Sequence, residues 1–291
     1  MSKPSKRKHV TAHIATLDPV KDHQEIVFLL SCHAFSWDTE RALEFGLFRT
    51  YAVPSISKLL SKTGEFKNRP QKRYDDTELI MYEMLENGYD SDRAKEAFKR
   101  LNGMHNSFNI SNDDFLYVLT TFMYTPIYWV EKYGWRKLTQ NERLSVFLFF
   151  REVGKRMNIK DIPDDYDTFE KFHHQYEQDN FRFSETNREI GIYTRNLILS
   201  FYLPKSLAFI GKPFVACFMD EQLIAAMGFR RPPKILKIIV KGIMNLRAGV
   251  VRYLPERKSP RLGTQVKRAT YPEGYEIDEL GTRPKAQKEM L

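Results

Sequence analysis

The residue best placed to do chemistry is His105. At about 100° per residue, the segment after Asp90 puts His105 on one apolar stripe of a predicted helix. The other members of that stripe are Ala94, Phe98, Leu101 and Phe108. A buried imidazole costs free energy unless each ring nitrogen finds a partner. Two outcomes satisfy it: hydrogen bonds within the core, or coordination of a metal or haem iron by a neutral ring nitrogen. The spacing alone leaves both open.

Arg73 and Thr77 form a second candidate group upstream. They are four residues apart, so they share one face at the start of a predicted helix. An arginine can pair with a carboxylate such as a haem propionate, and a threonine hydroxyl can hold a bound diatomic molecule or a water. The alternative is a capped helix with a surface salt bridge. Without further context, these two residues favour that alternative.

Glu170 and His173 have the Glu-x-x-His spacing that helical di-iron proteins use. Such a site needs a second copy of the motif from another helix, and the sequence has none. Charged residues surround His173 and His174, namely Asp164, Asp165, Glu170 and Lys171. The sequence therefore predicts that both histidines lie on a solvated helix face.

The remaining reactive residues have no spacing that indicates chemistry. The other histidines are scattered through the N-terminal region at His9, His13, His23 and His33. Cys32 and Cys217 are too few and too far apart for a disulfide framework, which favours a reducing compartment. The sequence has neither a Gly-x-Ser-x-Gly nucleophile elbow nor a glycine-rich phosphate loop. Nucleophilic catalysis and phosphate binding by such a loop therefore have no support.

The elements that must position these residues are helices. Helical periodicity dominates from about residue 25 to residue 255 and strand-like alternation is scarce, so the fold class is all-α, in a single large domain. Ser111 with Asp114, and Thr139 with Glu142, are spaced as capping boxes. Further helices are expected up to Pro204 and after the Pro232–Pro233 break. The predicted ranges are 112–132, 140–157, 168–176, 187–202 and 234–254.

Positive charge is concentrated in one part of the chain. Between Arg230 and Arg268 lie twelve basic residues and one acid, a local balance of +11 in a chain of net charge +9, so the remaining residues sum to −2. This distribution excludes a protein that binds nucleic acid over its whole surface. The basic stretch also lacks interleaved aromatic side chains for base stacking, so no nucleic-acid partner is expected.

The predicted helix 234–254 is amphipathic. Its basic stripe consists of Lys234, Lys237, Lys241 and Arg252, and the opposite stripe consists of Ile239, Ile243, Leu246 and Val250. Arg247 interrupts this pattern. Such a helix suits an anionic membrane surface, where each cation contributes about 1 kcal/mol. The alternative is a helix packed into the core, with its lysines facing water.

Several segments, in this order, resemble a known family, the MpaB-type ER-bound oxygenases and the rubber oxygenases (latex-clearing proteins). The segments are LFRTYAVPSISKLLSKTGEF (47–66), KRYDDTELIMYEML (72–85), RLNGMHNSF (100–108), DDFLYVLTTFMYTPIYWVEKYGWRKLTQNER (113–143), RYLPER (252–257) and TYPEGY (270–275). The resemblance implies an all-helical fold that holds haem b. It also implies that His105 is the iron ligand and that Arg73 and Thr77 line the haem pocket.

The activity implied by the resemblance is that of a haem-dependent oxygenase. It would use dioxygen to cleave a carbon–carbon double bond of a lipophilic, isoprenoid-like substrate. The rubber-cleaving branch has a lysine before the pocket threonine, where this chain has Asp76. That branch also uses an upstream glutamate, and Glu65 is only the nearest acid here, so no catalytic residue is assigned. These departures favour the alternative of a non-catalytic haem- or lipid-binding protein of the same fold.

The expected domain organisation has three parts. Residues 1–25 form a flexible basic tail, 26–255 the helical oxygenase-like domain, and 256–291 a C-terminal tail whose TYPEGY segment wraps over the domain. The N-terminus lacks the apolar core of a secretory signal, and no segment reaches the roughly 18 apolar residues of a membrane span. A cytoplasmic protein attached peripherally to a membrane is therefore expected.

Overall fold

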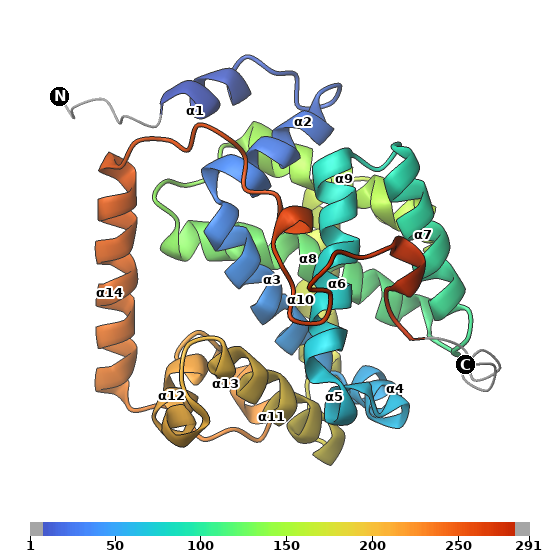
Figure 1. The fold of residues 1–291 in the computed structure, drawn as a ribbon, viewed down its shortest axis with the longest axis vertical. Coiled ribbons are helices and arrows are strands. Elements are labelled where there is room, and N and C mark those ends of the chain that lie inside the picture. The colour runs from blue at the N-terminus through green and yellow to red at the C-terminus, as the bar shows by residue number, and fades with distance from the viewer. Residues whose placement is uncertain (1–7, 283–291) are drawn as a thin grey trace.

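The computed structural model describes residues 8–282, and every regular element in that range is a helix (Figure 1). The α-helices are α1 (Lys8–Ile14), α2 (His23–Phe28), α3 (Ser36–Tyr51), α4 (Pro54–Thr63), α5 (Glu65–Asn68), α6 (Pro70–Asn87), α7 (Asp92–His105), α8 (Asn112–Tyr133), α9 (Gln140–Arg156), α10 (Tyr166–Asn180), α11 (Glu185–Ser200), α12 (Ala208–Ala216), α13 (Glu221–Ala226) and α14 (Lys234–Tyr253). A π-helical turn, η1 (Leu29–Ala34), follows α2, and the short 3₁₀ turns are η2 (Lys205–Leu207), η3 (Gly263–Gln265) and η4 (Ile277–Glu279). The all-α prediction is confirmed.

Local capping signals fix where the central helices begin. The Thr139 hydroxyl accepts the Glu142 amide at 3.2 Å, and the Glu142 carboxylate accepts the Thr139 amide at 2.7 Å, so α9 opens with a complete capping box. The Ser111 hydroxyl caps α8 in the same way. The Asp114 carboxylate, however, does not return to the cap. It accepts hydrogen bonds from Tyr176 and Ser55 instead, so the second predicted box is only half formed.

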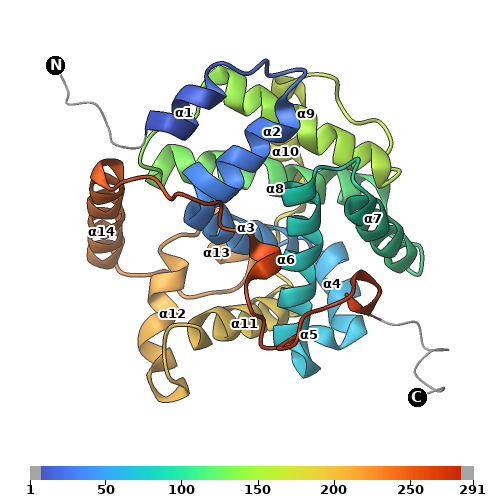
Figure 2. The same cartoon turned by 45° about the horizontal axis from the view of Figure 1, so that its top comes forward.

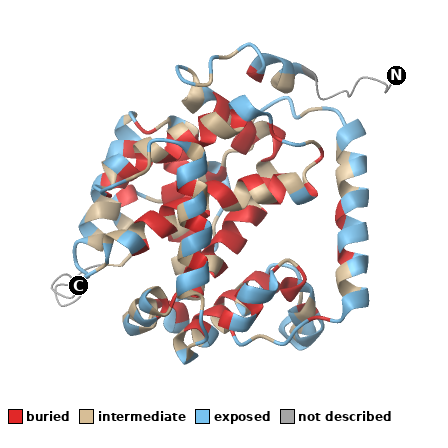
Figure 3. Cartoon of the chain, turned by 180° about the vertical axis from the view of Figure 1, so that it is seen from behind, coloured by how far each residue is buried: buried red, intermediate tan, exposed pale blue. Residues whose placement is uncertain are grey.

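The core is built around α8, which runs through the middle of the molecule and packs on α3 and α10 (Figure 2). Its buried tyrosines Tyr117 and Tyr124 are completely inaccessible to solvent. One apolar cluster joins α8 to α2, α6, α7 and α9, and a second joins α8 and α3 to α11 and α13. The buried residues concentrate on the faces where these helices meet (Figure 3). This frame places the N-terminal half of α6 beside the C-terminal end of α7, where the predicted site residues lie.

The first part of the chain contributes to this core. Residues 8–14 belong to the segment expected to be a tail, yet they form α1, and Ile14 is 5% exposed. The Val10 amide donates to the Glu256 carboxylate at 3.2 Å, which ties α1 to a segment 246 residues away. Residues 1–7 and 283–291 of the two expected tails lie outside the described residues.

Residues 255–282, which we call the C-terminal strap, run back along α6 (Figure 1). The buried carboxylates of α6 hold the strap by a succession of hydrogen bonds and one ion pair. The pairs are Glu86 with Gly263 and Thr264, Glu78 with Arg268, Asp75 with Thr270, Asp76 with Tyr271, and Glu83 with Tyr275. Arg100 on α7 then donates to the carbonyls of Leu280 and Thr282. The strap therefore fastens α6 to α7.

Candidate functional site

A cavity of about 280 Å³ lies between α3, α4, α6, α7, α8 and α9. Its wall is mainly apolar, with Ile80, Met81, Leu101, Met104, Val118 and Leu119 among its members. Arg73, Thr77 and His105 all line it, although they come from two helices. The fold thus brings together the three site residues that the sequence predicts. The strap reaches this cavity too, through Gly281 and Thr282.

His105 is the last residue of α7, and its ring faces Phe115 with a centroid distance of 5.2 Å. Its Nδ1 atom is buried and has no hydrogen-bond partner among the described residues. Burial, followed by the positive charge of Arg73, lowers the pKa of His105 to about 4. The imidazole is therefore neutral near pH 7 and keeps an unused lone pair. The sequence predicts that Phe108 belongs to the same helical stripe as His105. Phe108 instead lies beyond the end of α7 and is 37% exposed, so this part of the prediction is wrong.

Arg73 and Thr77 interact with each other across one turn of α6. The Arg73 guanidinium donates to the Thr77 hydroxyl, and that hydroxyl donates to the Arg73 carbonyl at 2.8 Å. The guanidinium also lies over the Phe66 ring at 5.6 Å. Among residues 8–282 it forms no ion pair with a carboxylate, so the surface salt bridge of the alternative interpretation is absent. A cation without an anion therefore lines an apolar cavity.

The acids near Arg73 are occupied by other cations. The Glu65 carboxylate accepts two hydrogen bonds from Arg69, at 2.6 and 2.9 Å. The Asp76 carboxylate pairs with Lys72 at 2.9 Å and accepts the Tyr271 hydroxyl at 2.6 Å. Both acids line the cavity. Each of these carboxylates already accepts hydrogen bonds from other side chains. Neither is therefore free to act as a base in this arrangement.

His173 corrects one prediction from the sequence, because it is 1% exposed and does not lie on a solvated face. Its Nδ1 bonds to the Thr120 hydroxyl at 2.8 Å, and its Nε2 lies 3.3 Å from Glu177. Burial lowers its pKa well below the ordinary value. Only His174 is exposed, as predicted. The residues that bury His173 come from α8, so nothing local in its own helix indicated its burial.

Ligand atoms of His173, His174 and Glu177 lie within 4.8 Å of one another, a spacing that a metal ion could bridge. The Glu177 carboxylate, however, already accepts hydrogen bonds from the Arg49 guanidinium and from the Tyr117 hydroxyl. Glu170, which is the acid of the predicted Glu-x-x-His motif, accepts the Tyr128 hydroxyl at 2.8 Å. These contacts satisfy the carboxylates without a metal, so this group is best explained as a core network.

The geometry of residues 8–282 defines a class of protein: an all-helical protein with a largely apolar binding cavity. Within these residues, the cavity carries a neutral histidine whose buried Nδ1 has no partner and an arginine that forms no ion pair. The sequence comparisons name that class. Residues 43–270 match the family model of the ER-bound oxygenase mpaB/B′ and rubber oxygenase catalytic domain, and the chain belongs to this family.

The similar proteins include three fungal enzymes. ER-bound oxygenase mpaB′ of Penicillium brevicompactum is 31% identical over 230 residues, which cover 72% of this chain and 54% of the relative. ER-bound oxygenase mpaB of Penicillium roqueforti is 32% identical over 209 residues, covering 64% of this chain and 68% of the relative. The mpaB of Penicillium brevicompactum is 37% identical over 123 residues, or 40% of this chain and 31% of the relative. The chain thus spans about half the length of the first of these relatives.

These relatives are named as bound to the ER, which directs attention to membrane contact. Within residues 8–282, none of the helices combines the length and the apolar character that crossing a bilayer requires.

Proposed function

We propose that the protein is a haem b-dependent oxygenase that acts on a lipophilic, isoprenoid-like substrate by oxidative cleavage of a carbon–carbon double bond. The observation that carries this proposal is the neutral imidazole of His105, whose buried Nδ1 has no partner in the described chain. An unsatisfied polar atom in a native cavity calls for an explanation, and an absent ligand supplies one. Family membership then points to an oxygenase.

The residues of the cavity fit a haem. Iron takes a neutral imidazole as an axial ligand, and His105 is neutral near pH 7. The macrocycle is apolar and carries two propionates, which suits an apolar wall with the unpaired cation of Arg73. The cavity volume of about 280 Å³ is close to the lower end of the roughly 300–1,000 Å³ typical of small-molecule sites.

Each site residue then has a defined task. A bound haem would supply the redox-active iron that binds dioxygen. His105 would hold the group from the end of α7, and Arg73 would orient it through a propionate. The Thr77 hydroxyl fixes the rotamer of Arg73 through the hydrogen bond between them. The apolar wall excludes water and takes up the hydrocarbon chain of the substrate.

An absorption spectrum of the purified protein tests haem binding. We expect an intense Soret band in protein from haem-replete cells, and we expect His105→Ala to lose it while the circular dichroism spectrum stays helical. His33→Ala is the matched control, because the His33 Nδ1 is also buried without a partner but does not line the cavity. A colourless wild-type protein, or a band that survives in His105→Ala, would contradict the proposal.

A second arm tests the role of Arg73. Arg73→Gln should weaken binding of haem but not of haem dimethyl ester, which lacks the carboxylates that Arg73 would pair with. The loss should be about tenfold or more, since a charge-assisted hydrogen bond contributes about 1.5–3 kcal/mol. Equal losses for haem and for its diester would show that Arg73 acts on the fold and not on a propionate.

The alternative function, a passive haem or lipid binder, is favoured by the pairing of Glu65 with Arg69 and of Asp76 with Lys72. Oxygen uptake in the presence of long isoprenoid lipids separates the two functions. Stoichiometric uptake with formation of carbonyl products supports the oxygenase. A haem-loaded protein that consumes no oxygen with any member of a broad lipid panel is the passive binder.

We further propose that the protein attaches peripherally to an anionic membrane through α14. One face of α14 is buried through Val240 and Met244. The opposite face carries Ile235, Ile238, Ile239, Ile243, Leu246, Val250 and Tyr253, each at least 49% exposed. Lys234 and Lys241 are exposed along one edge of that apolar face. Apolar side chains flanked by lysines match a surface with an acyl interior and anionic head groups.

The neighbouring helix extends this surface. α12 contacts α14, and its Phe209, Ile210 and Phe214 are 66%, 48% and 38% exposed. Lys212 is exposed on the same helix. α14 stands at the edge of the molecule, with exposed residues along most of its length (Figure 3). The core-packed alternative does not explain this arrangement, because the aliphatic stripe of α14 is not in the core.

Co-sedimentation with vesicles tests the attachment. We expect binding to vesicles that contain phosphatidylserine, weaker binding at high salt, and loss of binding in Ile238→Ser/Leu246→Ser. Val20→Ser is the control, because Val20 is 59% exposed and lies far from α14 in the sequence. Lys234→Gln/Lys241→Gln should weaken binding about thirtyfold, from two charges at about 1 kcal/mol each. Equal binding to neutral and anionic vesicles would contradict the proposal.

A further inference from the structure

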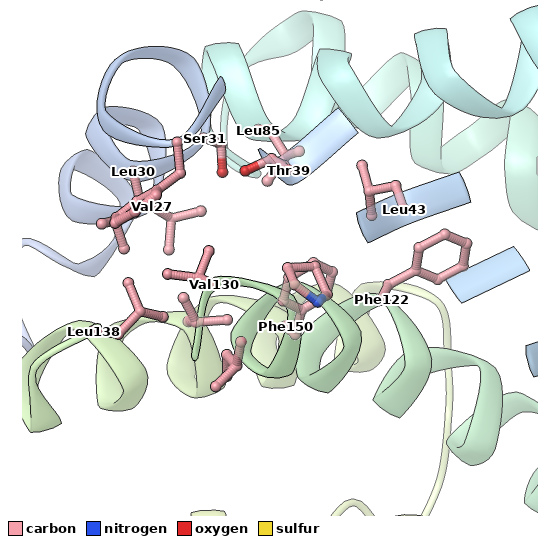
Figure 4. A pocket seen from close by; sticks show the side chains of 14 residues that line it. Val27, Leu30, Ser31, Thr39, Leu43, Leu85, Phe122, Val130, Leu138 and Phe150 are labelled. Atoms are coloured by element: carbon pink, nitrogen blue, oxygen red, sulfur yellow. The ribbon is translucent and has the colours of Figure 1, made fainter. Parts of the chain in front are cut away.

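A second, smaller cavity of about 40 Å³ shares part of its lining with the large one. Its wall is almost entirely hydrocarbon, with side chains such as Val27, Leu30 and Val130 directed into it, and the hydroxyls of Ser31 and Thr39 lie together on one side (Figure 4). Phe122 and Phe150 line both cavities. These two rings therefore form the wall between the small cavity and the proposed reaction site.

Two irregularities of the backbone border this small cavity. On one side, Leu30 and Ser31 belong to the π-helical turn η1, which is wider than an α-helical turn. On the other side, Pro126 lies inside α8, where it removes a backbone hydrogen bond and pushes against the carbonyl of Phe122. Neighbouring helices with such defects cannot pack their side chains as closely as two regular helices. Both irregularities thus lie at the small cavity, where they leave less regular packing between the helices.

The size and chemistry of the small cavity select its ligand. About 40 Å³ is too small for a hydrocarbon chain but large enough for one diatomic molecule or one xenon atom. A water molecule needs two to four polar partners, and the only polar side chains in the lining are those of Ser31 and Thr39, both on one side. Apolar cavities of this kind stay dry and take up small apolar species.

We propose that the small cavity binds dioxygen and passes it to the large cavity between Phe122 and Phe150. This inference rests on the proposed oxygenase function. The large cavity opens near the exposed Phe108 at the end of α7. A lipid chain that enters there fills the opening, so the second substrate needs another route. The small cavity meets the large one at Phe122 and Phe150 and does not include Phe108 in its lining, so it provides one.

Xenon is the probe for the gas site, because its binding requires neither haem nor turnover. Crystals exposed to xenon under pressure should show an anomalous peak among Leu30, Ile127 and Val130. An ordered water at that position, or the absence of xenon, overturns the inference. If xenon binds but the protein consumes no oxygen with any lipid, the oxygenase function fails while the gas site stands.

A pair of matched variants on α9 tests the route. Val146 lines only the small cavity and Val153 only the large one, and both are buried, at 9% and 3% exposure. Val146→Phe should abolish the xenon peak and raise the KM for dioxygen several-fold, with the KM for the lipid unchanged. Val153→Phe should keep the xenon peak and raise the KM for the lipid instead. An unchanged KM for dioxygen in Val146→Phe overturns the route, and Leu138→Phe fills the same cavity if Val146→Phe does not fold.

Discussion

At the scale of single residues, the polar groups inside this protein divide into those that have partners and those that do not. His173 is buried but bonded to Thr120, whereas the buried Nδ1 of His105 has no partner among residues 8–282. Arg69 and Lys72 are paired with acids, whereas Arg73 forms no ion pair within the same residues. Native proteins rarely leave buried polar groups unsatisfied, so such a group calls for an explanation. His33 also has a buried Nδ1 without a partner in the described chain, but of these two histidines only His105 lines the same cavity as Arg73.

Burial also shapes how stability depends on pH. The Glu44 carboxyl is 2% exposed, and burial raises its pKa from 4.5 to about 7. The Tyr74 hydroxyl lies within hydrogen-bond distance of both Glu44 and Glu78, at 2.9 and 2.8 Å, but has only one proton to donate. The Arg41 guanidinium lies 3.0 Å from the Glu44 carboxylate and offsets part of the effect of burial, but the pKa of Glu44 stays raised.

The prediction concerns Glu44→Gln. A raised pKa in the folded state means that the contribution of Glu44 to stability is present below pH 4.5 and is lost as the pH rises through about 7. The variant should therefore lose less stability than the wild type between pH 5 and about 8, as measured by urea unfolding. Glu273→Gln, at an exposed position, should behave like the wild type. Equal pH dependence in Glu44→Gln and the wild type would contradict this assignment.

The sequence indicated which residues lie together on the cavity better than it indicated their surroundings. The resemblance of its segments to a family singled out Arg73, Thr77 and His105, and the fold places all three on one cavity. The burial of His173 could not be predicted, because Thr120 and Tyr117, which contact it, lie more than 50 residues earlier. Periodicity reports the face that a residue occupies on its own helix, but not what covers that face.

At the scale of secondary-structure elements, local signals located the helices well. The Thr139 capping box and the Ser111 cap fixed the starts of α9 and α8 at the predicted residues. The amphipathic pattern of 234–254 also predicted α14. It did not predict which face packs, since the aliphatic stripe is exposed and Arg247 faces the protein. The residue that interrupted the pattern is thus the one that attaches the helix.

Arg247 anchors α14 to the body of the protein. Its guanidinium donates to both carboxylate oxygens of Asp38, at 2.9 and 3.2 Å, and stacks over the Trp37 ring at 3.7 Å. Asp38 is 1% exposed, so removing Arg247 leaves a buried carboxylate with weaker compensation.

We predict that Arg247→Ala lowers the free energy of unfolding by about 2–3 kcal/mol in chemical denaturation. Lys241→Ala, an exposed change on the same helix, should shift it by less than about 0.5 kcal/mol. The double variant Arg247→Ala/Asp38→Asn should recover part of the loss, because the asparagine amide carries no negative charge to bury. Similar values for Arg247→Ala and Lys241→Ala would show that Arg247 is not an anchor.

The small cavity has an energetic cost at this scale. At about 24 cal/mol per Å³, a void of 40 Å³ costs about 1 kcal/mol of stability. A packed interior without this void would be more stable by about that amount.

At the scale of the whole molecule, the C-terminal strap joins elements that are far apart in the chain. Its contacts with α6 connect residues separated by about 180–195 positions. Neither periodicity nor a local motif can reveal such pairs. The sequence therefore indicated that the TYPEGY segment covers the domain, but it did not indicate the row of α6 carboxylates beneath the strap. The strap also reaches the large cavity, so it couples overall stability to the site.

Gly263→Ala is the variant that tests this coupling. A Cβ at position 263 would lie within 2.5 Å of Tyr82 ring atoms, a contact that forces the strap away from α6. We predict a loss of about 1–3 kcal/mol in unfolding free energy and faster proteolytic cleavage within the strap. Gly249→Ala, which meets no atom within 4 Å on α14, should leave both unchanged or improve stability. Unaltered cleavage in Gly263→Ala would mean that the strap does not depend on this close approach.

The strap has a consequence for how the protein is made. Asp75, Asp76, Glu78, Glu83 and Glu86 leave the ribosome nearly two hundred residues before the partners that satisfy them. During synthesis α6 therefore carries a row of carboxylates that cannot yet be buried, and the wall formed by Gly281 and Thr282 is still absent. In that interval the large cavity lacks this part of its wall, so the haem that we propose would enter most easily then. Synthesis of the strap then supplies the missing part of the wall.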